Sequence, residues 1–247
     1  MNKVTHIMFD LFNTLYRFDP ERETTQINAA KLIGIEITNA KIVSALNKAD
    51  KWFAKKTSEI SLHLMNDKEK DLFYSNYEKI LFNYAGYEIS DKDSKIIWDY
   101  VKNMKSSLKL FEDAKNLLNV LKNKKISTAI VTNFDSDGKS LSKSLGIPDL
   151  VDFVITSKDA GASKPSNKIF DYALNYINAK PENCIFIGDQ IETDILGAKR
   201  ANIMPLLIDR DSINADYKDC IVISDLMETL NHCLLYTSDA ADERSSV

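Results

Sequence analysis

The 247-residue chain is poor in the residue types that mark several specialised classes of protein. It has only three cysteines and three histidines. Cys184, Cys220 and Cys233 are widely spaced and have no partner at metal-ligand spacing, so neither a disulfide framework nor a zinc site is expected. No apolar run approaches the ~20 residues that span a bilayer, and the first residues lack the layout of a signal peptide. We therefore expect a cytoplasmic protein with free thiols and no membrane partner.

Charge of one sign is also scarce. The formal net charge is −4, and the sequence contains no extended block of Lys and Arg. Proteins that neutralise many phosphates of a nucleic acid need such a basic surface, so nucleic acid is not an expected partner. The content of 44% hydrophobic and 28% charged residues is that of an ordinary globular protein with a sizeable core.

Short apolar runs rich in Val, Ile and Phe recur along the chain, and from about residue 111 onward they alternate with helical patterns. The apolar runs are 4–9, 126–131, 151–155, 184–187, 204–208 and 220–223. The helical patterns are 112–123, 136–145, 167–177 and 194–201. Strands that are apolar throughout and separated by helices are typical of a parallel sheet covered on both faces. We therefore predict an α/β fold with a doubly wound parallel sheet.

Residues 17–104 have a different character, because strong strand signals are lacking there. Helical spacing of apolar residues predicts four helices, at about 24–35, 38–57, 67–85 and 91–104. A helical block inserted after the first strand is expected to form a cap domain that excludes water from the strand ends. The α/β core would then consist of 1–16 and 105–233.

The last stretch, 234–247, follows neither pattern. Its Leu-Leu-Tyr-Thr-Ser-Asp-Ala-Ala-Asp-Glu resembles the translation of a sequencing-adapter read-through. We therefore expect this tail to be non-native and exclude it from the prediction of the fold.

Polar side chains follow four of the predicted strands or the loops beyond them. They are Asp10 with Thr14, then Thr132 with Asn133, then Lys164, and finally Asp189 with Asp194. Because the carboxyl ends of parallel strands face the same way, these groups are expected to converge on one crevice.

The charges of this crevice predict its chemistry. Three carboxylates at short range repel one another unless cations lie among them, and a single lysine is not enough. Oxygen ligands of this kind suit Mg²⁺, while Thr132, Asn133 and Lys164 can hold an anionic group. A carboxylate nucleophile beside a divalent cation, a lysine and a hydroxyl indicates phosphoryl transfer through an aspartyl-phosphate.

The four segments, in this order and around a helical insertion, resemble the motifs of the haloacid dehalogenase (HAD) superfamily. The resemblance covers 1–233 and implies a Rossmann-like core with a helical cap between the first and second motifs. It implies Asp10 as nucleophile, Thr132 as hydrogen-bond donor to phosphate and Lys164 as the neutralising charge. It also implies that Asp10, the backbone carbonyl of Phe12, Asp189 and Asp194 hold Mg²⁺. Asn133 and Thr14 are expected to contact the substrate.

Phe12 departs from this pattern, because family phosphatases normally have an Asp there that protonates the leaving group. Such help is worth typically ~10²–10⁴-fold in rate, and phenylalanine cannot transfer a proton. Three hypotheses follow. The first is a Mg²⁺-dependent phosphatase of a small phosphorylated metabolite, with either another acid/base residue or an undemanding leaving group, such as that of an acyl or aryl phosphate. The second is a haloacid-dehalogenase-type hydrolase, which Asp189 fits poorly. The third is a weakly active or non-catalytic relative that binds a phosphorylated ligand or a protein.

Overall fold

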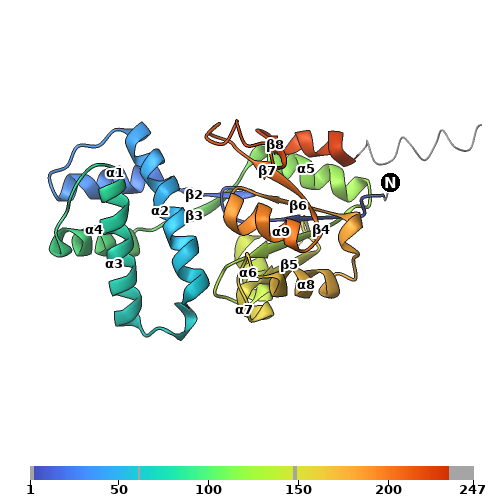
Figure 1. Cartoon of the computed structure of the whole chain (residues 1–247), viewed down its shortest axis with the longest axis horizontal. Coiled ribbons are helices and arrows are strands. Elements are labelled where there is room, and N and C mark those ends of the chain that lie inside the picture. Colours follow the sequence, from blue (N-terminus) through green and yellow to red (C-terminus); the bar gives the residue numbers. More distant parts are fainter. Residues whose placement is uncertain (1–2, 61, 147–148, 234–247) are drawn as a thin grey trace, which may run out of the picture. The chain divides into compact units, whose positions relative to one another are not determined.

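The computed structural model describes residues 3–60, 62–146 and 149–233 (Figure 1). The expected non-native tail, 234–247, lies outside the described residues. Contacts divide the chain into two compact units. One contains the described residues up to Arg17 together with those from Leu110 onward, and the other is Phe18–Lys109.

The first unit is built on a six-stranded sheet in the order β5-β4-β1-β6-β7-β8. Every neighbouring pair in this sheet is parallel. The strands are β1 (His6–Phe9), β4 (Ser127–Thr132), β5 (Phe153–Thr156), β6 (Cys184–Gly188), β7 (Met204–Ile208) and β8 (Ile221–Ile223). Each predicted apolar run thus overlaps a strand, and the prediction of a doubly wound parallel sheet is confirmed.

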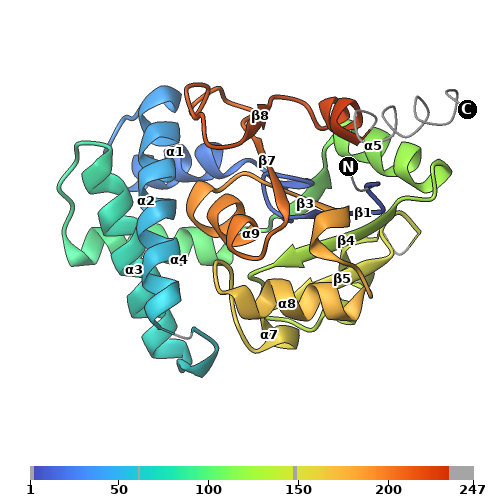
Figure 2. The ribbon, with the colours of Figure 1, turned by 45° about the vertical axis from the view of Figure 1, so that its right-hand side comes forward.

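Helices cover both faces of this sheet. They are α5 (Glu112–Asn123), α6 (Gly138–Leu145), α7 (Ser157–Ala160), α8 (Asn167–Tyr176) and α9 (Leu196–Arg200). Figure 2 shows α5 and α8 on opposite sides of the strands. Met8 and Phe186 pack with Phe170 of α8 and Ala198 of α9 in one buried cluster. Because side chains alternate along a strand, neighbouring strand residues such as Ile7 face the other helical layer.

The second unit contains four long helices, close to the predicted ranges. They are α1 (Arg22–Leu32), α2 (Asn39–Glu59), α3 (Asp67–Tyr84) and α4 (Asp91–Asn103), with a short 3₁₀ turn, η1 (Leu62–Leu64). Side-chain capping boxes begin α3 at Asn66 and α4 at Ser90, which explains why both helices start where the sequence indicates. These helices share a core of their own that includes Ile42, Leu81 and Ile97. That this unit acts as a cap stays a prediction.

Two elements differ from the sequence prediction. β2 (Tyr16–Asp19) and β3 (Ser107–Leu110) form a separate two-stranded sheet, although the sequence shows no strong strand signal there. Each has four residues, and most of their side chains are half-buried or exposed, so the continuous apolar run of a central strand is missing. The chain passes from one unit to the other within these two strands.

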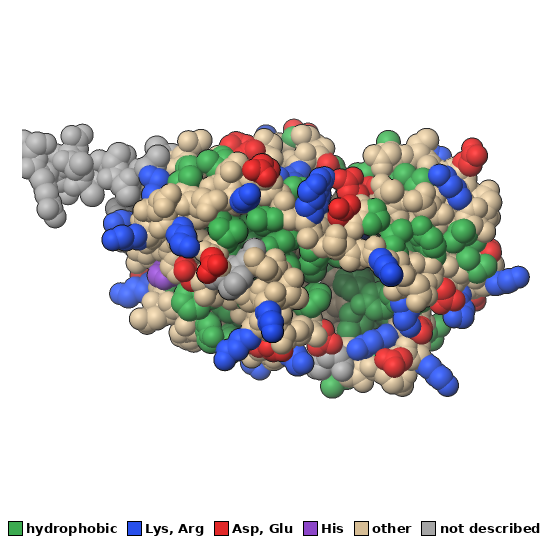
Figure 3. Space-filling view, turned by 180° about the vertical axis from the view of Figure 1, so that it is seen from behind, with side chains coloured by type: hydrophobic (Ala, Val, Ile, Leu, Met, Phe, Trp, Pro, Cys, Tyr) green, Lys and Arg blue, Asp and Glu red, His purple; other side chains and the backbone are tan. Residues whose placement is uncertain are grey.

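The molecular surface carries mixed charge. On the face drawn in Figure 3, basic and acidic side chains are interspersed, and neither sign gathers into a continuous track. Among the described residues, no helix has both the length and the apolar character needed to cross a bilayer.

Candidate active site

The strand ends bring three predicted site residues to one edge of the sheet. Asp10 directly follows β1, and its backbone N–H donates to the carbonyl of Ile187 at 2.8 Å. Thr132 is the last residue of β4, and Asp189 directly follows β6. Because β4 and β6 are the two parallel neighbours of β1, all three ends meet at the carboxyl edge.

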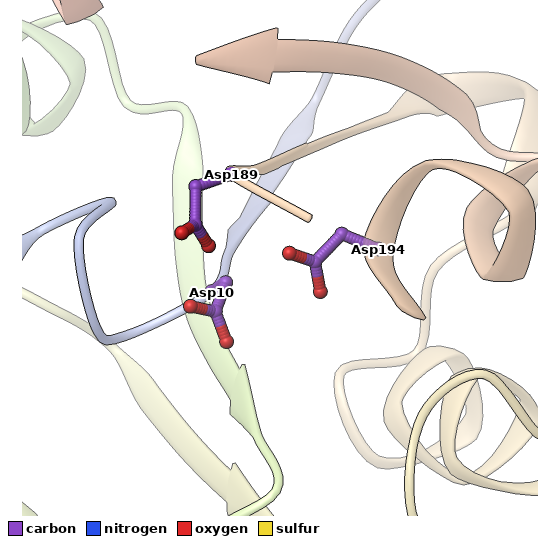
Figure 4. A group of neighbouring side chains, drawn as sticks. All are labelled: Asp10, Asp189 and Asp194. Carbon is purple, nitrogen blue, oxygen red and sulfur yellow. The ribbon is translucent and has the colours of Figure 1, made fainter. Parts of the chain in front are cut away.

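The carboxylates of Asp10, Asp189 and Asp194 converge at this edge (Figure 4). One oxygen of each lies within 4.8 Å of the others. Asp194 is 1% exposed and Asp10 is 8% exposed. The Oδ1 atom of Asp189 is buried and has no hydrogen-bond partner among the described residues. A buried acceptor without a partner is costly, so this oxygen is free to bind a cation.

Lys164 lies among these carboxylates, next to Asp10 and Asp194. Its loop runs between α7 and α8, and the side chain is buried. Its Nζ is 2.5 Å from Oδ1 of Asp10 and 2.7 Å from Oδ1 of Asp194. Burial opposes the charge of Lys164, but attraction to Asp10 and Asp194 outweighs it and raises the lysine pKa above its ordinary value. The ammonium is therefore a permanent positive charge beside Asp10.

One ammonium does not balance three carboxylates. Burial, with repulsion from Asp194, raises the pKa of Asp10 to about 6 in spite of Lys164. Burial, with repulsion from Asp10 and Asp194, raises the pKa of Asp189 well above its ordinary value. With all four groups ionised, two negative charges stay uncompensated. This donor set fits a divalent cation such as Mg²⁺, which carries the missing charge and prefers carboxylate oxygens.

Asp194 reaches the site through an unusual helix start. Ile191–Ile195 form a π-helical turn, in which the carbonyl of Gln190 accepts hydrogen bonds from the N–H groups of Asp194 (2.9 Å) and Ile195 (3.2 Å). The N–H of Gln190 donates in turn to Oδ2 of Asp194 at 3.1 Å. A Cβ on Gly188 would overlap with this carboxylate, so only glycine fits there. The sequence predicts an α-helix over 194–201, whereas α9 itself begins only at Leu196.

Asn133 contacts the loop of Lys164, and its predicted contact with substrate stays a prediction. Its Nδ2 donates to the backbone carbonyl of Lys164 at 3.0 Å, and its Oδ1 accepts from the N–H of Lys164 at 2.7 Å. Both ends of the side chain amide thus fix the loop that carries the lysine. Thr14 is fully buried, and its hydroxyl has no partner within the described part of the chain. Its contact with substrate stays a prediction.

Phe12 is half-buried in the loop that follows Asp10. Its ring centroid lies 5.9 Å from that of Phe134, which follows β4 and is 37% exposed. The position that carries the acid in family phosphatases is therefore occupied by one of a pair of aromatic rings. The backbone carbonyl of Phe12 is unaffected by this substitution.

Two residues of the site were missed in the sequence. Asn13 donates from Nδ2 to Oδ2 of Asp189 at 3.3 Å, and Arg210 donates to the backbone carbonyls of Asn13 and Thr14. The sequence could have indicated Arg210, because this residue lies just beyond the predicted strand 204–208. Asp10 and Asp189 likewise lie just beyond predicted strands. Asn13 gave only the weaker signal of a turn-forming residue next to the nucleophile.

The family model for haloacid dehalogenase-like hydrolases matches residues 4–202. A ribulose-1,5-bisphosphate 5-phosphatase of Halopiger xanaduensis is 24% identical over 83% of this chain and 84% of its own length. A glyceraldehyde 3-phosphate phosphatase of Methanocaldococcus jannaschii is 27% identical over 86% of each chain. The crystal structure of the HAD-hydrolase YfnB of Bacillus subtilis, bound to magnesium, shares the fold with a TM-score of 0.63 at 19% identity, over 94% of this chain and 99% of YfnB. The chain therefore belongs to the haloacid dehalogenase-like hydrolase family.

Proposed function

We propose that this protein is a Mg²⁺-dependent phosphatase that hydrolyses a small phosphorylated metabolite through an aspartyl-phosphate on Asp10. The observation that carries the proposal is the buried group of three carboxylates around one lysine, with two negative charges uncompensated. The relatives of M. jannaschii and H. xanaduensis are phosphatases of small phosphorylated sugars, which supports a small phosphorylated substrate but not the kind of leaving group.

In this proposal each residue has one task. The Asp10 carboxylate attacks phosphorus, and the bond between phosphorus and the leaving oxygen breaks. Lys164 neutralises charge on the phosphoryl group and on Asp10, and the Thr132 hydroxyl donates to a phosphoryl oxygen. Asp10, the Phe12 carbonyl, Asp189 and Asp194 would hold Mg²⁺, which would supply the remaining positive charge. Water then attacks the aspartyl-phosphate, which releases phosphate and restores Asp10.

The leaving group is restricted by Phe12. A phenyl ring cannot donate a proton, so the departing oxygen must leave as an anion or take its proton from water. Acyl and aryl phosphates meet this condition because their leaving groups are weak bases. The Phe12–Phe134 pair adds an apolar surface beside the nucleophile, which suits an aryl or other flat leaving group.

The same aromatic pair supports a second candidate function, the binding of a phosphorylated ligand without turnover. A dehalogenase role is disfavoured by charge. Haloacid substrates carry a carboxylate, and Asp189 and Asp194 would repel it in a site without a metal ion.

The test is release of phosphate from an aryl phosphate and an acyl phosphate, with Mg²⁺ and with EDTA, using Asp10→Asn as the matched blank. We expect Mg²⁺-dependent release that Asp10→Asn reduces by at least about 10³-fold, because the amide is not a nucleophile. Binding of both phosphates without release by folded wild-type protein would support the binding role. Halide release from a haloacid in EDTA would overturn the proposal in favour of a dehalogenase.

A further inference from the structure

Arg210 joins three segments of the first unit. Its Nη1 donates to Oδ2 of Asp113 at 2.8 Å, and its Nη2 donates to Oδ1 of Asp113 at 3.2 Å. Its Nε donates to the carbonyl of Asn13 at 3.1 Å, and Nη2 also donates to the carbonyl of Thr14 at 2.8 Å. The guanidinium carbon lies 3.8 Å from the ring centroid of Phe111. A planar fork of fixed N–H donors makes all these contacts at once, which a lysine cannot do.

The position of the guanidinium is itself fixed. Asp113 is the second residue of α5, and its carboxylate also accepts from the backbone N–H groups of Ala114 (2.8 Å) and Leu226 (2.9 Å). The Phe111 ring covers one face of Arg210. Arg210 therefore approaches the loop after β1 from a rigid support.

This loop needs support because of its backbone. Asn13 has a φ of 58°, in the left-handed region that costs energy for a residue with a side chain. Inside the loop the N–H of Asn13 donates to the carbonyl of Tyr16 at 2.7 Å, and the N–H of Leu15 donates to the carbonyl of Leu11 at 3.0 Å. The carbonyls of Asn13 and Thr14 are the ones that Arg210 binds. The N–H groups of the turn thus make hydrogen bonds within the loop, and its carbonyls accept hydrogen bonds from Arg210.

The loop carries two groups that act at the carboxylate site. The backbone carbonyl of Phe12 is one of the proposed oxygen ligands, and Asn13 Nδ2 donates to Asp189 Oδ2. Small rotations of the Asn13 backbone would move both groups. Partners outside the direct ligands of a metal commonly change its affinity by ~10–100-fold when they are removed.

We propose that Arg210 is a positioning residue that sets the Mg²⁺ affinity of the site by locking the Phe12–Asn13–Thr14 turn against α5. The inference rests on the proposed Mg²⁺ site. It assigns to Arg210 no contact with substrate and no role in proton transfer.

The experiment uses the full chain and the variant Arg210→Lys, which keeps the charge but loses the fork. Mg²⁺ affinity is measured by titration calorimetry, and order in the 10–16 segment by hydrogen–deuterium exchange without metal. We expect Mg²⁺ to bind about 10-fold more weakly, with faster exchange at Asn13 and Leu15. Turnover at saturating Mg²⁺ should stay within about 3-fold of wild type, because the nucleophile and Lys164 are untouched.

Two further variants separate positioning from general destabilisation. Phe111→Leu keeps the guanidinium but removes the ring beneath it, and it should weaken Mg²⁺ binding by a smaller factor, about 2–3-fold. Arg200→Lys is the matched control, since Arg200 lies on α9 and makes only a long hydrogen bond of 3.5 Å to Pro165 among the contacts described. It should leave affinity and exchange unchanged.

Folded Arg210→Lys protein that binds Mg²⁺ as tightly as wild type, with unchanged exchange, would overturn this inference alone. A lower melting temperature without a change in affinity would do the same, because it would assign Arg210 a purely structural role. Wild-type protein that binds no Mg²⁺ would overturn the proposed function together with this inference.

Discussion

In the proposed function a single side chain, Phe12, determines which phosphate esters the site can cleave quickly. The carboxylates of Asp10, Asp189 and Asp194 lie together with Lys164, but an aromatic ring stands where a proton donor is expected. The ring contacts Phe134, so it belongs to an apolar surface that a simple loss of the acid would not by itself create. In the proposed function, a leaving group that needs no proton fits both rings.

We expect Phe12→Asp to raise kcat/KM for an alkyl phosphate by at least about 10-fold, because the new carboxyl can protonate the leaving oxygen. An aryl or acyl phosphate should gain less than about 3-fold, since its leaving group does not need the proton. Phosphate release measured for both substrates checks the difference. Phe12→Leu, which removes the ring without adding an acid, is the control and should give no gain with the alkyl phosphate. Equal gains for both substrates would contradict this account.

At the scale of elements, α3 contains a buried acid that the active site does not use. Glu78 is 2% exposed, and its Oε2 has no partner among the residues that the structure describes. Gln26 of α1 donates a hydrogen bond to it, and Arg22 and Asp50 are the charged groups nearby. Arg22 is already paired with Asp50 at 2.8 Å, so it neutralises Glu78 poorly. Burial therefore raises the pKa of Glu78 from 4.5 to about 8.

This pKa predicts how the helical unit responds to pH. Between pH 4.5 and about 8 the folded unit holds a proton on Glu78 that the unfolded chain releases. The contribution of Glu78 to the free energy of unfolding should therefore be largest below pH 4.5 and fall as the pH rises to about 8. Glu78→Gln should abolish this fall, so that its stability relative to wild type rises by about 4 kcal/mol between pH 4.5 and about 8, measured by urea unfolding. The exposed Glu88→Gln is the control, and a pH slope unchanged in Glu78→Gln would contradict the prediction.

The elements also show how far sequence alone leads. Central strands and amphipathic helices were predictable. A strand that is buried on both faces is apolar throughout, and a helix that is buried on one face has apolar residues at helical spacing. β2 and β3 were not, since the short, partly exposed strands of a separate two-stranded sheet need no such pattern. The π-helical turn before α9 was not predictable either, because it depends on one carbonyl, that of Gln190, accepting two N–H groups.

The site residues divide in the same way. Asp10 and Asp189 could be found because charge at the end of an apolar strand is rare and therefore informative. The use of Asn133 to clamp Lys164, and of Arg210 to hold two carbonyls, depends on backbone groups of distant loops. Backbone partners of this kind have no sequence signature, because every residue has the same backbone carbonyl.

At the scale of the whole molecule, one unit supplies every proposed ligand of the metal. The binding of Mg²⁺ should therefore stabilise the folded chain by about 2.7 kcal/mol at a concentration 100 times its Kd. In a unit of this size that corresponds to a rise in melting temperature of about 5–10 °C. Differential scanning calorimetry with Mg²⁺ and with EDTA measures this rise.

The matched variant for this prediction is Asp189→Asn, which removes one of the uncompensated carboxylates without changing shape. In EDTA it should melt higher than wild type, because repulsion within the group is reduced. With Mg²⁺ it should show little or no rise. A variant that melts lower than wild type in EDTA would mean that repulsion among the three carboxylates does not destabilise the folded protein.

The order of the sheet also has a consequence during synthesis of the protein. The central strand β1 is made first, yet its neighbours β4 and β6 come more than one hundred residues later. The contact of Lys164 with Asp10 closes a separation of 154 residues, and that of Arg210 with Asn13 closes 197. A chain still emerging from the ribosome thus contains Asp10 early, but it still lacks Lys164 beside Asp10 and Arg210 beside Asn13. The helical unit, whose contacts are nearer in sequence, can fold before these distant contacts form, so activity should arise only after the chain through Arg210 has been made.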